Sequence, residues 1–282
     1  MSELTKSLSE WESAGIPEML SVVIPAHNEE GHVGETVRNL VRLLSEEGVN
    51  HEILIINDGS SDRTEEILTE LQRDLPSVRY LNNEPPNGYG FAVRHGLAEF
   101  CGDAVAVFMA DGSDDPADLV KFYRKLQEGY DCVFGSRFMN GGKVIDYPWP
   151  KLALNRLGNA FIRLLFLIRY NDVTNAFKLF RREVIAGLHP LLSQHFNLTV
   201  ELPLKSIVRG YRYAVVPNSW RNRREGISKF AVREMGSRYM FIILYCLLEK
   251  FLLRNDYRKH ADDLHRRRME VNASPEMGEK SC

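Results

Sequence analysis

The chain has 282 residues, of which 44% are hydrophobic, so it can bury a sizeable core and is not disordered as a whole. Its 36 basic and 38 acidic residues leave a net charge of −2, which excludes the basic excess of a general nucleic-acid binder. The four cysteines are scattered along the chain, so they predict neither a disulfide framework nor a zinc site.

Residues 1–19, which we treat as an N-terminal extension, are polar and lack the apolar run typical of a signal peptide. The longest apolar run, residues 240–248, has nine residues, whereas a membrane-spanning helix needs roughly 20. We therefore expect a protein that is soluble or bound to a membrane surface.

Residues 20–136 alternate short apolar runs with amphipathic stretches. The expected strands are 20–25, 52–57, 78–81, 104–109 and 132–136, and the expected helices are 32–46, 63–73, 90–100 and 116–127. Strands that alternate with helices of this length predict right-handed crossovers and a mostly parallel sheet. The strands are nearly all apolar, which is typical of a sheet covered by helices on both faces. The fold class is α/β.

After Ser136 the pattern loosens. We expect a loop at 140–150, a helix at 152–168, a short strand within 172–180, a helix at 200–209, a strand at 213–217, a basic irregular stretch at 220–229 and a last helix at 232–253. Residues 255–282 are charged and poor in apolar side chains, so we expect a disordered tail.

Ligands of open α/β sheets bind at the carboxyl ends of the strands. Three polar segments follow expected strands there: 25–29 (Pro-Ala-His-Asn-Glu), 57–60 (Asn-Asp-Gly-Ser) and 110–115 (Ala-Asp-Gly-Ser-Asp-Asp). Acidic groups dominate, and neither Gly-x-Gly-x-x-Gly nor a P-loop motif is present. A dinucleotide-dependent dehydrogenase and a P-loop NTPase are therefore disfavoured.

The segments 21–30 and 55–64, together with the acidic motif near residue 111, resemble glycosyltransferase family 2. The later motifs Gly135-Ser136-Arg137, 172–178 and 223–229 follow in the order seen in polyprenyl- or dolichyl-phosphate sugar transferases of that family. The resemblance covers about residues 20–230. It implies a GT-A fold, a GDP- or UDP-linked sugar as donor, a polyprenyl or dolichyl phosphate as acceptor, and Mg²⁺ or Mn²⁺.

The resemblance also assigns the nucleotide-binding residues. Asp58 is expected to accept hydrogen bonds from a base N–H, while Pro25, His27 and Glu29 lie in the loop that covers the base and ribose. Asp58 has an alternative interpretation as a turn former, because Asn-Asp-Gly-Ser is a strong turn sequence.

The acidic motif, residues 109–116, departs from the Asp-x-Asp usual in the family. Its carboxylates are still the hard oxygen ligands that Mg²⁺ and Mn²⁺ prefer, so we expect Asp111 and Asp114 to bind the metal. Through the metal, Asp111 also belongs to the nucleotide site and to catalysis. The alternative is that Asp114 or Asp115 caps the helix that begins at Pro116, and for Asp115 we favour the cap.

Departure of a diphosphate requires positive charge at the leaving group. We expect Arg137, Arg223 and Lys229 to supply it; the alternative for 223–229 is a solvated basic loop. A phosphate acceptor is anionic near pH 7 and needs little help from a general base. Lys178, Glu201 and Ser228 are assigned to the acceptor side. Lys178 has a surface position as its alternative, and Glu201 has a structural pairing with a nearby arginine.

Residues 231–254 combine apolar and aromatic side chains with flanking cations, which suits an amphipathic helix in a membrane interface. The alternatives are packing on the sheet or a homo-oligomer contact, and residues 152–168 could form a second such element. We therefore predict an inverting, metal-dependent hexosyltransferase bound peripherally to the cytoplasmic face of a membrane. The rival functions are a soluble family 2 transferase acting on a sugar hydroxyl and a catalytically silent nucleotide-sugar-binding protein.

Overall fold

A computed structural model describes residues 17–222 and 232–253. Its centre is a seven-stranded sheet of order β3-β2-β1-β4-β7-β5-β8. The strands are β1 (Leu20–Ala26), β2 (His51–Asn57), β3 (Val78–Asn82), β4 (Ala104–Val107), β5 (Cys132–Ser136), β7 (Lys178–Arg181) and β8 (Tyr213–Pro217). Neighbouring strands are parallel, except that β7 runs antiparallel to β4 and β5. The predicted mostly parallel sheet is confirmed.

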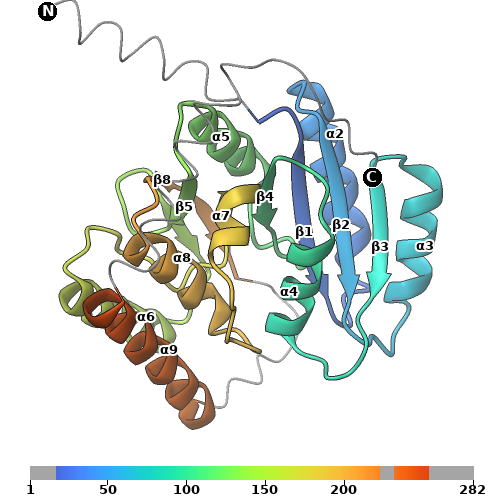
Figure 1. Cartoon of the computed structure of the whole chain (residues 1–282). Helices are drawn as coiled ribbons and strands as arrows, with labels where there is room; N and C mark the ends of the chain where they lie inside the picture. Colours follow the sequence, from blue (N-terminus) through green and yellow to red (C-terminus); the bar gives the residue numbers. More distant parts are fainter. Residues whose placement is uncertain (1–16, 223–231, 254–282) are drawn as a thin grey trace, which may run out of the picture.

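Helices cover both faces of this sheet (Figure 1). One layer holds α2 (Val33–Glu46), α3 (Thr64–Asp74) and α5 (Pro116–Gln127), and the other holds α4 (Tyr89–Glu99), α7 (Arg182–Gly187) and α8 (Leu198–Val208). Successive strand residues point to opposite faces. Val22 and Ile24 therefore pack in the hydrophobic core under α2, α3 and α5, while Val23 between them packs in the core on the other face, under α4, α7 and α8.

The local sequence explains where the helices form. In α2 the buried Val33, Val37, Leu40 and Leu44 follow the spacing of one helix face. The side chain of Asp115 accepts a hydrogen bond from Ala117 N at 2.9 Å and caps α5, whose first residue is Pro116. The cap predicted for Asp115 is confirmed.

A second, two-stranded sheet was not expected from the sequence. Strands β6 (Lys143–Ile145) and β9 (Ser219–Arg221) pair in parallel within stretches that the sequence predicts as loop and irregular chain. This small sheet contacts the acidic motif, because Arg221 N donates to Ser113 O at 3.0 Å and Trp220 bridges to Asp114.

Helices α6 (Trp149–Phe166) and α9 (Val232–Leu252) lie side by side outside α8 (Figure 1). A buried ion pair joins α9 to α8: Arg209 Nε donates to Glu249 Oε1 at 2.6 Å, and both side chains are 1% exposed. Lys250 Nζ donates to Phe166 O at 2.6 Å and joins α9 to α6. Among the helices of the described ranges, none is both long and apolar enough to cross a bilayer.

Candidate active site

Two loops at the carboxyl ends of β1 and β2 hold each other in place. Asn28 N donates to Ser60 Oγ at 3.0 Å, and Ser61 N donates to Asn28 Oδ1 at 2.8 Å. Glu29 N donates to Thr64 Oγ1 at 2.9 Å. These reciprocal bonds fix the segment in which Pro25, His27 and Glu29 were predicted to bind the nucleotide, so this edge of the site is organised before any ligand binds.

Asp58 is buried at the end of β2 and anchors a third segment. Its carboxylate accepts hydrogen bonds from Asn83 Nδ2 at 2.8 Å, Asn87 Nδ2 at 3.1 Å and Gly88 N at 2.8 Å. The Asp58 carbonyl contacts His27 Nδ1 at 2.8 Å. Asp58 therefore does more than form a turn, since it ties the β1, β2 and α4 loops together. Recognition of a base by Asp58 stays a prediction.

The acidic motif follows β4. Gly112 adopts φ +68°, a left-handed conformation that favours glycine, and it turns the chain so that Asp111 and Asp114 lie near each other. Thr36 Oγ1 of α2 donates to Ala110 O at 3.0 Å and fixes the start of the motif. Asp111 Oδ1 accepts a hydrogen bond from Ser113 N at 3.1 Å.

Asp114 is a buried carboxylate with weak hydrogen bonding from the chain. It accepts from Met109 N at 3.4 Å. Burial, together with the nearby Asp111 charge, raises the pKa of Asp114 to about 7. The helix cap considered for Asp114 is wrong, because Asp115 occupies that position.

The two aspartates fit a divalent cation. The buried Asp114 lies near the partly exposed Asp111, and a bound cation would remove the repulsion between their charges. In the part of the chain that the structure describes, no three acidic, histidine or cysteine side chains gather around one point. A cation held here would thus take its other ligands from water or substrate phosphates, as Mg²⁺ commonly does.

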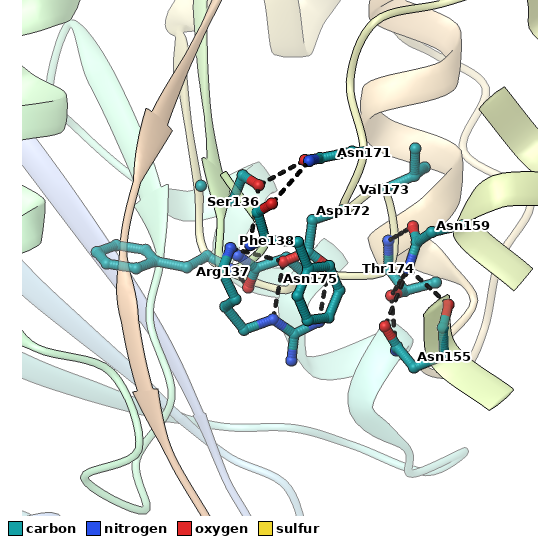
Figure 2. Close-up of polar contacts among 12 residues, drawn as sticks. Ser136, Arg137, Phe138, Asn155, Asn159, Asn171, Asp172, Val173, Thr174 and Asn175 are labelled. Atoms are coloured by element: carbon teal, nitrogen blue, oxygen red, sulfur yellow. Dashed lines mark hydrogen bonds and ion pairs between the residues drawn. The ribbon is translucent and has the colours of Figure 1, made fainter. Parts of the chain in front are cut away.

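Arg137 follows β5 and is held by Asp172 (Figure 2). Its Nε and Nη2 donate to Asp172 Oδ2 and Oδ1 at 2.8 and 2.7 Å, and its backbone N donates to Oδ2 at 2.9 Å. Although burial opposes it, this carboxylate raises the pKa of Arg137. Arg137 is 9% exposed, and one terminal guanidinium nitrogen points away from Asp172 (Figure 2). The predicted role of Arg137 at the leaving diphosphate stays a prediction, and the structure adds that Asp172 holds its guanidinium.

Lys178 lies in strand β7, between β4 and β5, and is 1% exposed, so its alternative surface position is wrong. Its Nζ donates to Val173 O at 3.2 Å. Burial lowers the pKa of Lys178 to about 7, with Arg137 acting in the same direction and Asp172 and Asp114 opposing it. Lys178 thus belongs to a buried charge cluster with Asp114, Arg137 and Asp172. A contact with the acceptor stays a prediction.

Helix α6 is bonded to the loop that carries Asp172. Thr174 Oγ1 accepts from Asn155 Nδ2 at 2.9 Å and from Asn159 Nδ2 at 3.0 Å, and Thr174 N donates to Asn159 Oδ1 at 3.3 Å. Figure 2 shows Thr174 between the two asparagines, two residues after Asp172. The arrangement connects α6, through one short loop, to the side chain that orients Arg137.

Glu201 is fully buried in α8. Its Oε1 and Oε2 accept hydrogen bonds from Leu192 N at 2.8 Å and Ser193 N at 2.7 Å, and Lys205 Nζ lies 2.6 Å from Oε1. The structure favours the structural alternative for Glu201, with Lys205 as the partner in place of the expected arginine.

Sequence reasoning did not assign a role to Asp172 or Asn159. Asp172 belongs to the motif 172–178, so a signal was present, but its partner Arg137 lies 35 residues away in the chain. The predicted site residues Arg223, Ser228 and Lys229 lie outside the described residues.

The model of the family described as Glycosyl transferase family 2 matches residues 21–188. The chain belongs to glycosyltransferase family 2. This family 2 glycosyltransferase is 30% identical over 216 residues to polyprenol monophosphomannose synthase of Mycolicibacterium smegmatis, a match that covers 74% of this chain and 80% of that protein. It is 29% identical over 215 residues to dolichol-phosphate mannosyltransferase of Pyrococcus furiosus, with 74% of this chain and 58% of that protein covered.

Among solved structures, the family 2 glycosyltransferase is similar to glucosyl-3-phosphoglycerate synthase from Mycobacterium tuberculosis, in complex with Mn²⁺, uridine diphosphate and phosphoglyceric acid. The TM-score is 0.63 at 19% identity, and the likeness covers 86% of this chain and 82% of the other. At this identity the likeness shows the fold. The GT-A fold and the glycosyltransferase class predicted from the sequence are confirmed.

Proposed function

We propose that this glycosyltransferase moves a sugar, with inversion at the anomeric carbon, from a nucleotide-linked donor to a polyprenyl phosphate at a membrane surface. Two relatives, at 30% and 29% identity, are named for transfer to polyprenol or dolichol phosphate. The donor is a GDP- or UDP-linked hexose. Its nucleotide would lie on the edge built by the 27–30 and 58–64 loops and the Asp58 carboxylate.

The observation that carries this proposal is an apolar surface on α6 and α9. Large hydrophobic side chains on both helices are exposed to solvent: Trp149, Leu154, Leu157, Phe161, Leu164 and Leu167 in or just after α6, and Met240, Phe241, Leu244, Leu248, Phe251 and Leu252 in α9. Exposed apolar surfaces of this kind mark interaction sites. We call these twelve residues the apolar surface. It suits the acyl boundary of a bilayer, where the acceptor lipid resides.

The chemistry of the site supports a phosphate acceptor over a sugar hydroxyl. A hydroxyl needs a general base, whereas a phosphate monoester is already ionised near neutral pH. Glu201 is unsuited to be that base, because backbone N–H groups and Lys205 already surround its carboxylate. In the proposed step an acceptor phosphate oxygen forms the new bond to the anomeric carbon. The bond from that carbon to the diphosphate breaks, and its electron pair leaves with the diphosphate.

Asp111 and Asp114 would hold Mg²⁺ or Mn²⁺ together with the donor diphosphate. When bound, the cation counters the negative charge that the diphosphate gains on leaving. Arg137, fixed by Asp172, contributes positive charge at the same edge of the sheet. Arg223 and Lys229 are proposed to act on the leaving diphosphate as well.

The test is transfer of radiolabel from GDP-mannose or UDP-glucose to vesicles that contain a polyprenyl phosphate, followed by organic extraction. We expect label in the organic phase, dependence on Mg²⁺ or Mn²⁺, and no label with the unphosphorylated polyprenol. Asp111→Asn should remove most of the cation-dependent transfer, while Asp115→Asn, which keeps the helix cap, should not. Label that enters only soluble saccharides would overturn the proposal in favour of a hydroxyl acceptor.

A further inference from the structure

A hollow of about 330 Å³ lies between the segment that precedes α8 and the N-terminal half of α9. Its polar lining consists of Gln194, His195, Asn197, Ser237 and Arg238. Leu192 and Phe241 supply the apolar part. The hollow thus combines a guanidinium, an imidazole, amides and a hydroxyl with two hydrophobic side chains. None of these residues belongs to the strand-end loops or the acidic motif described above.

Asn197 indicates that the hollow takes a ligand with polar atoms. The side chain is 5% exposed, and its Nδ2 donates to Arg238 O at 3.4 Å. Because a carbonyl only accepts, this bond fixes which end of the amide is which. Asn197 Oδ1 is then buried without a hydrogen-bond partner among the described residues. A buried acceptor in this state is destabilising unless a ligand or an ordered water donates to it.

The wall of the hollow is continuous with the proposed donor site. Gly90 packs so closely on the backbone that an added Cβ would lie 2.4 Å from the Gln194 carbonyl carbon. The Tyr89 ring lies 4.5 Å from that of Phe196, between centroids. Gly88, one residue earlier, donates its N–H to Asp58. Segment 88–90 therefore contacts both the nucleotide edge, through Gly88, and the wall of the hollow, through Gly90.

The hollow and the apolar surface share one side chain. Phe241 lines the hollow and is also 60% exposed, in the same helix as the exposed Leu244 and Leu248. A ligand in the hollow can therefore contact an exposed hydrophobic side chain as well as Arg238. That combination suits an amphiphile with a hydrocarbon chain and an anionic head.

We propose that this hollow binds the phosphate end of the lipid acceptor, with Arg238 as its phosphate-binding residue. The inference rests on the proposed function and names the acceptor site within it. Arg238 pairs with the phosphate, and a water molecule donates one hydrogen bond to a phosphate oxygen and the other to Asn197 Oδ1. The first isoprene unit packs on Phe241 and Leu192. Segment 88–90, which contacts both sites, places the phosphate next to the donor edge.

The test compares Arg238→Gln with Arg163→Gln, which removes one exposed cation from α6 without touching the hollow. We expect Arg238→Gln to raise the KM for the lipid phosphate by about 10- to 100-fold, because one charge-assisted hydrogen bond to the phosphate is lost. The KM for the donor should not change, and Arg163→Gln should match wild type. Equal losses in the two variants would assign the effect to general attraction for anionic membranes and overturn the proposal. An unchanged KM in Arg238→Gln would overturn it as well.

Calorimetry separates failure of this inference from failure of the proposed function. The probes are a short-chain isoprenyl phosphate, the matching isoprenol and inorganic phosphate, each without donor. Tight binding of the isoprenyl phosphate alone, weakened in Arg238→Gln, supports the hollow even if no transfer is detected. Binding of inorganic phosphate with the same affinity would overturn the assignment of the hollow to a lipid. Unchanged affinity of Arg238→Gln for the isoprenyl phosphate would overturn the role of Arg238 and of the hollow.

Discussion

Asp114 and Lys178 show how burial alters single side chains in this site. Burial disfavours the charged form of each, so the pKa of the acid rises to about 7 and that of the base falls to about 7. Beside them, Arg137 and Asp172 form an ion pair at 2.7 Å. The buried cluster can therefore change its charge near neutral pH through Asp114 and Lys178.

The raised pKa of Asp114 predicts a pH-dependent metal affinity. In the metal-free protein the neutral form is favoured, so the contribution of Asp114 to stability is present below its ordinary pKa of 3.8 and lost as pH rises through about 7. Because a cation binds the carboxylate, apparent Mn²⁺ affinity should rise about tenfold per pH unit from pH 5 to 7 and level off above. Calorimetric titration across this range measures it.

Two variants sharpen that test. Asp114→Asn should remove the pH dependence and most of the affinity, whereas Asp115→Asn should retain both, because asparagine also caps helices. A pH dependence that survives in Asp114→Asn would place the titrating group elsewhere.

At the scale of elements, side-chain hydrogen bonds join α6 to the 172–175 loop, which carries Asp172. One hydroxyl oxygen, Thr174 Oγ1, accepts from two asparagines of α6. Asn159 is 1% exposed, so its amide has no access to water when that oxygen is lost. The position of Asp172, and with it the guanidinium of Arg137, depends on this loop.

We therefore expect Thr174→Val to lower kcat about tenfold at saturating donor, because Asn155 and the buried Asn159 lose the oxygen that they share with the loop, and the loop shifts. Thr174→Ser keeps the oxygen and should turn over like wild type. The KM for the donor should change little in either variant, and steady-state kinetics with both substrates gives the answer. Equal impairment of the serine and valine variants would mean that the hydroxyl alone does not hold the loop, and wild-type turnover in Thr174→Val would contradict the prediction.

The elements differ in how well the sequence predicts them. Hydrophobic periodicity places β1, β2 and α2 to within a few residues, because each buries a regular face. It predicts only a loosely bounded strand at β7, which has charged residues at both ends, Lys178 and Arg181, in fully buried positions. Strands β6 and β9 have three residues each and pair across more than 70 positions, so no local pattern marks them.

The site also has parts that a local sequence pattern predicts and parts that it does not. The strand-end loops and the acidic motif could be found from the sequence, since parallel strands bring their carboxyl ends to one edge. The Glu201–Lys205 pair has helical i,i+4 spacing and could also have been recognised. The Arg137–Asp172 pair could not, because nothing local indicates which carboxylate among many meets a given arginine.

At the scale of the whole molecule, the acidic strand ends and the apolar surface belong to the same folded domain. The proposed function needs both, because the first would bind the donor and the second the membrane. We expect the protein to float with anionic liposomes at low salt. Leu164→Glu/Leu248→Glu, with one charge on each helix, should abolish flotation, because both side chains are exposed, at 75% and 58%.

The matched control is Asn39→Asp/Gln72→Glu, which adds the same charge on α2 and α3, away from the apolar surface. This variant should float like wild type. If wild type stays at the bottom of the gradient, the apolar surface serves another purpose, and a contact between copies of the chain becomes the favoured explanation.

The buried Arg209–Glu249 pair sets a limit on where the enzyme can work. With both charges out of water, separating them would be strongly unfavourable, so α9 cannot swing on its connection as a flexible tether would. A bilayer that takes up α9 thereby fixes the tilt of the central sheet and the height of the strand ends above the headgroups. The distance from the membrane at which the active site can bind an acceptor is then fixed by the fold. Under the proposed function, we therefore expect the enzyme to glycosylate phosphates only in the membrane that holds it, and to leave a second vesicle pressed against the first unmodified.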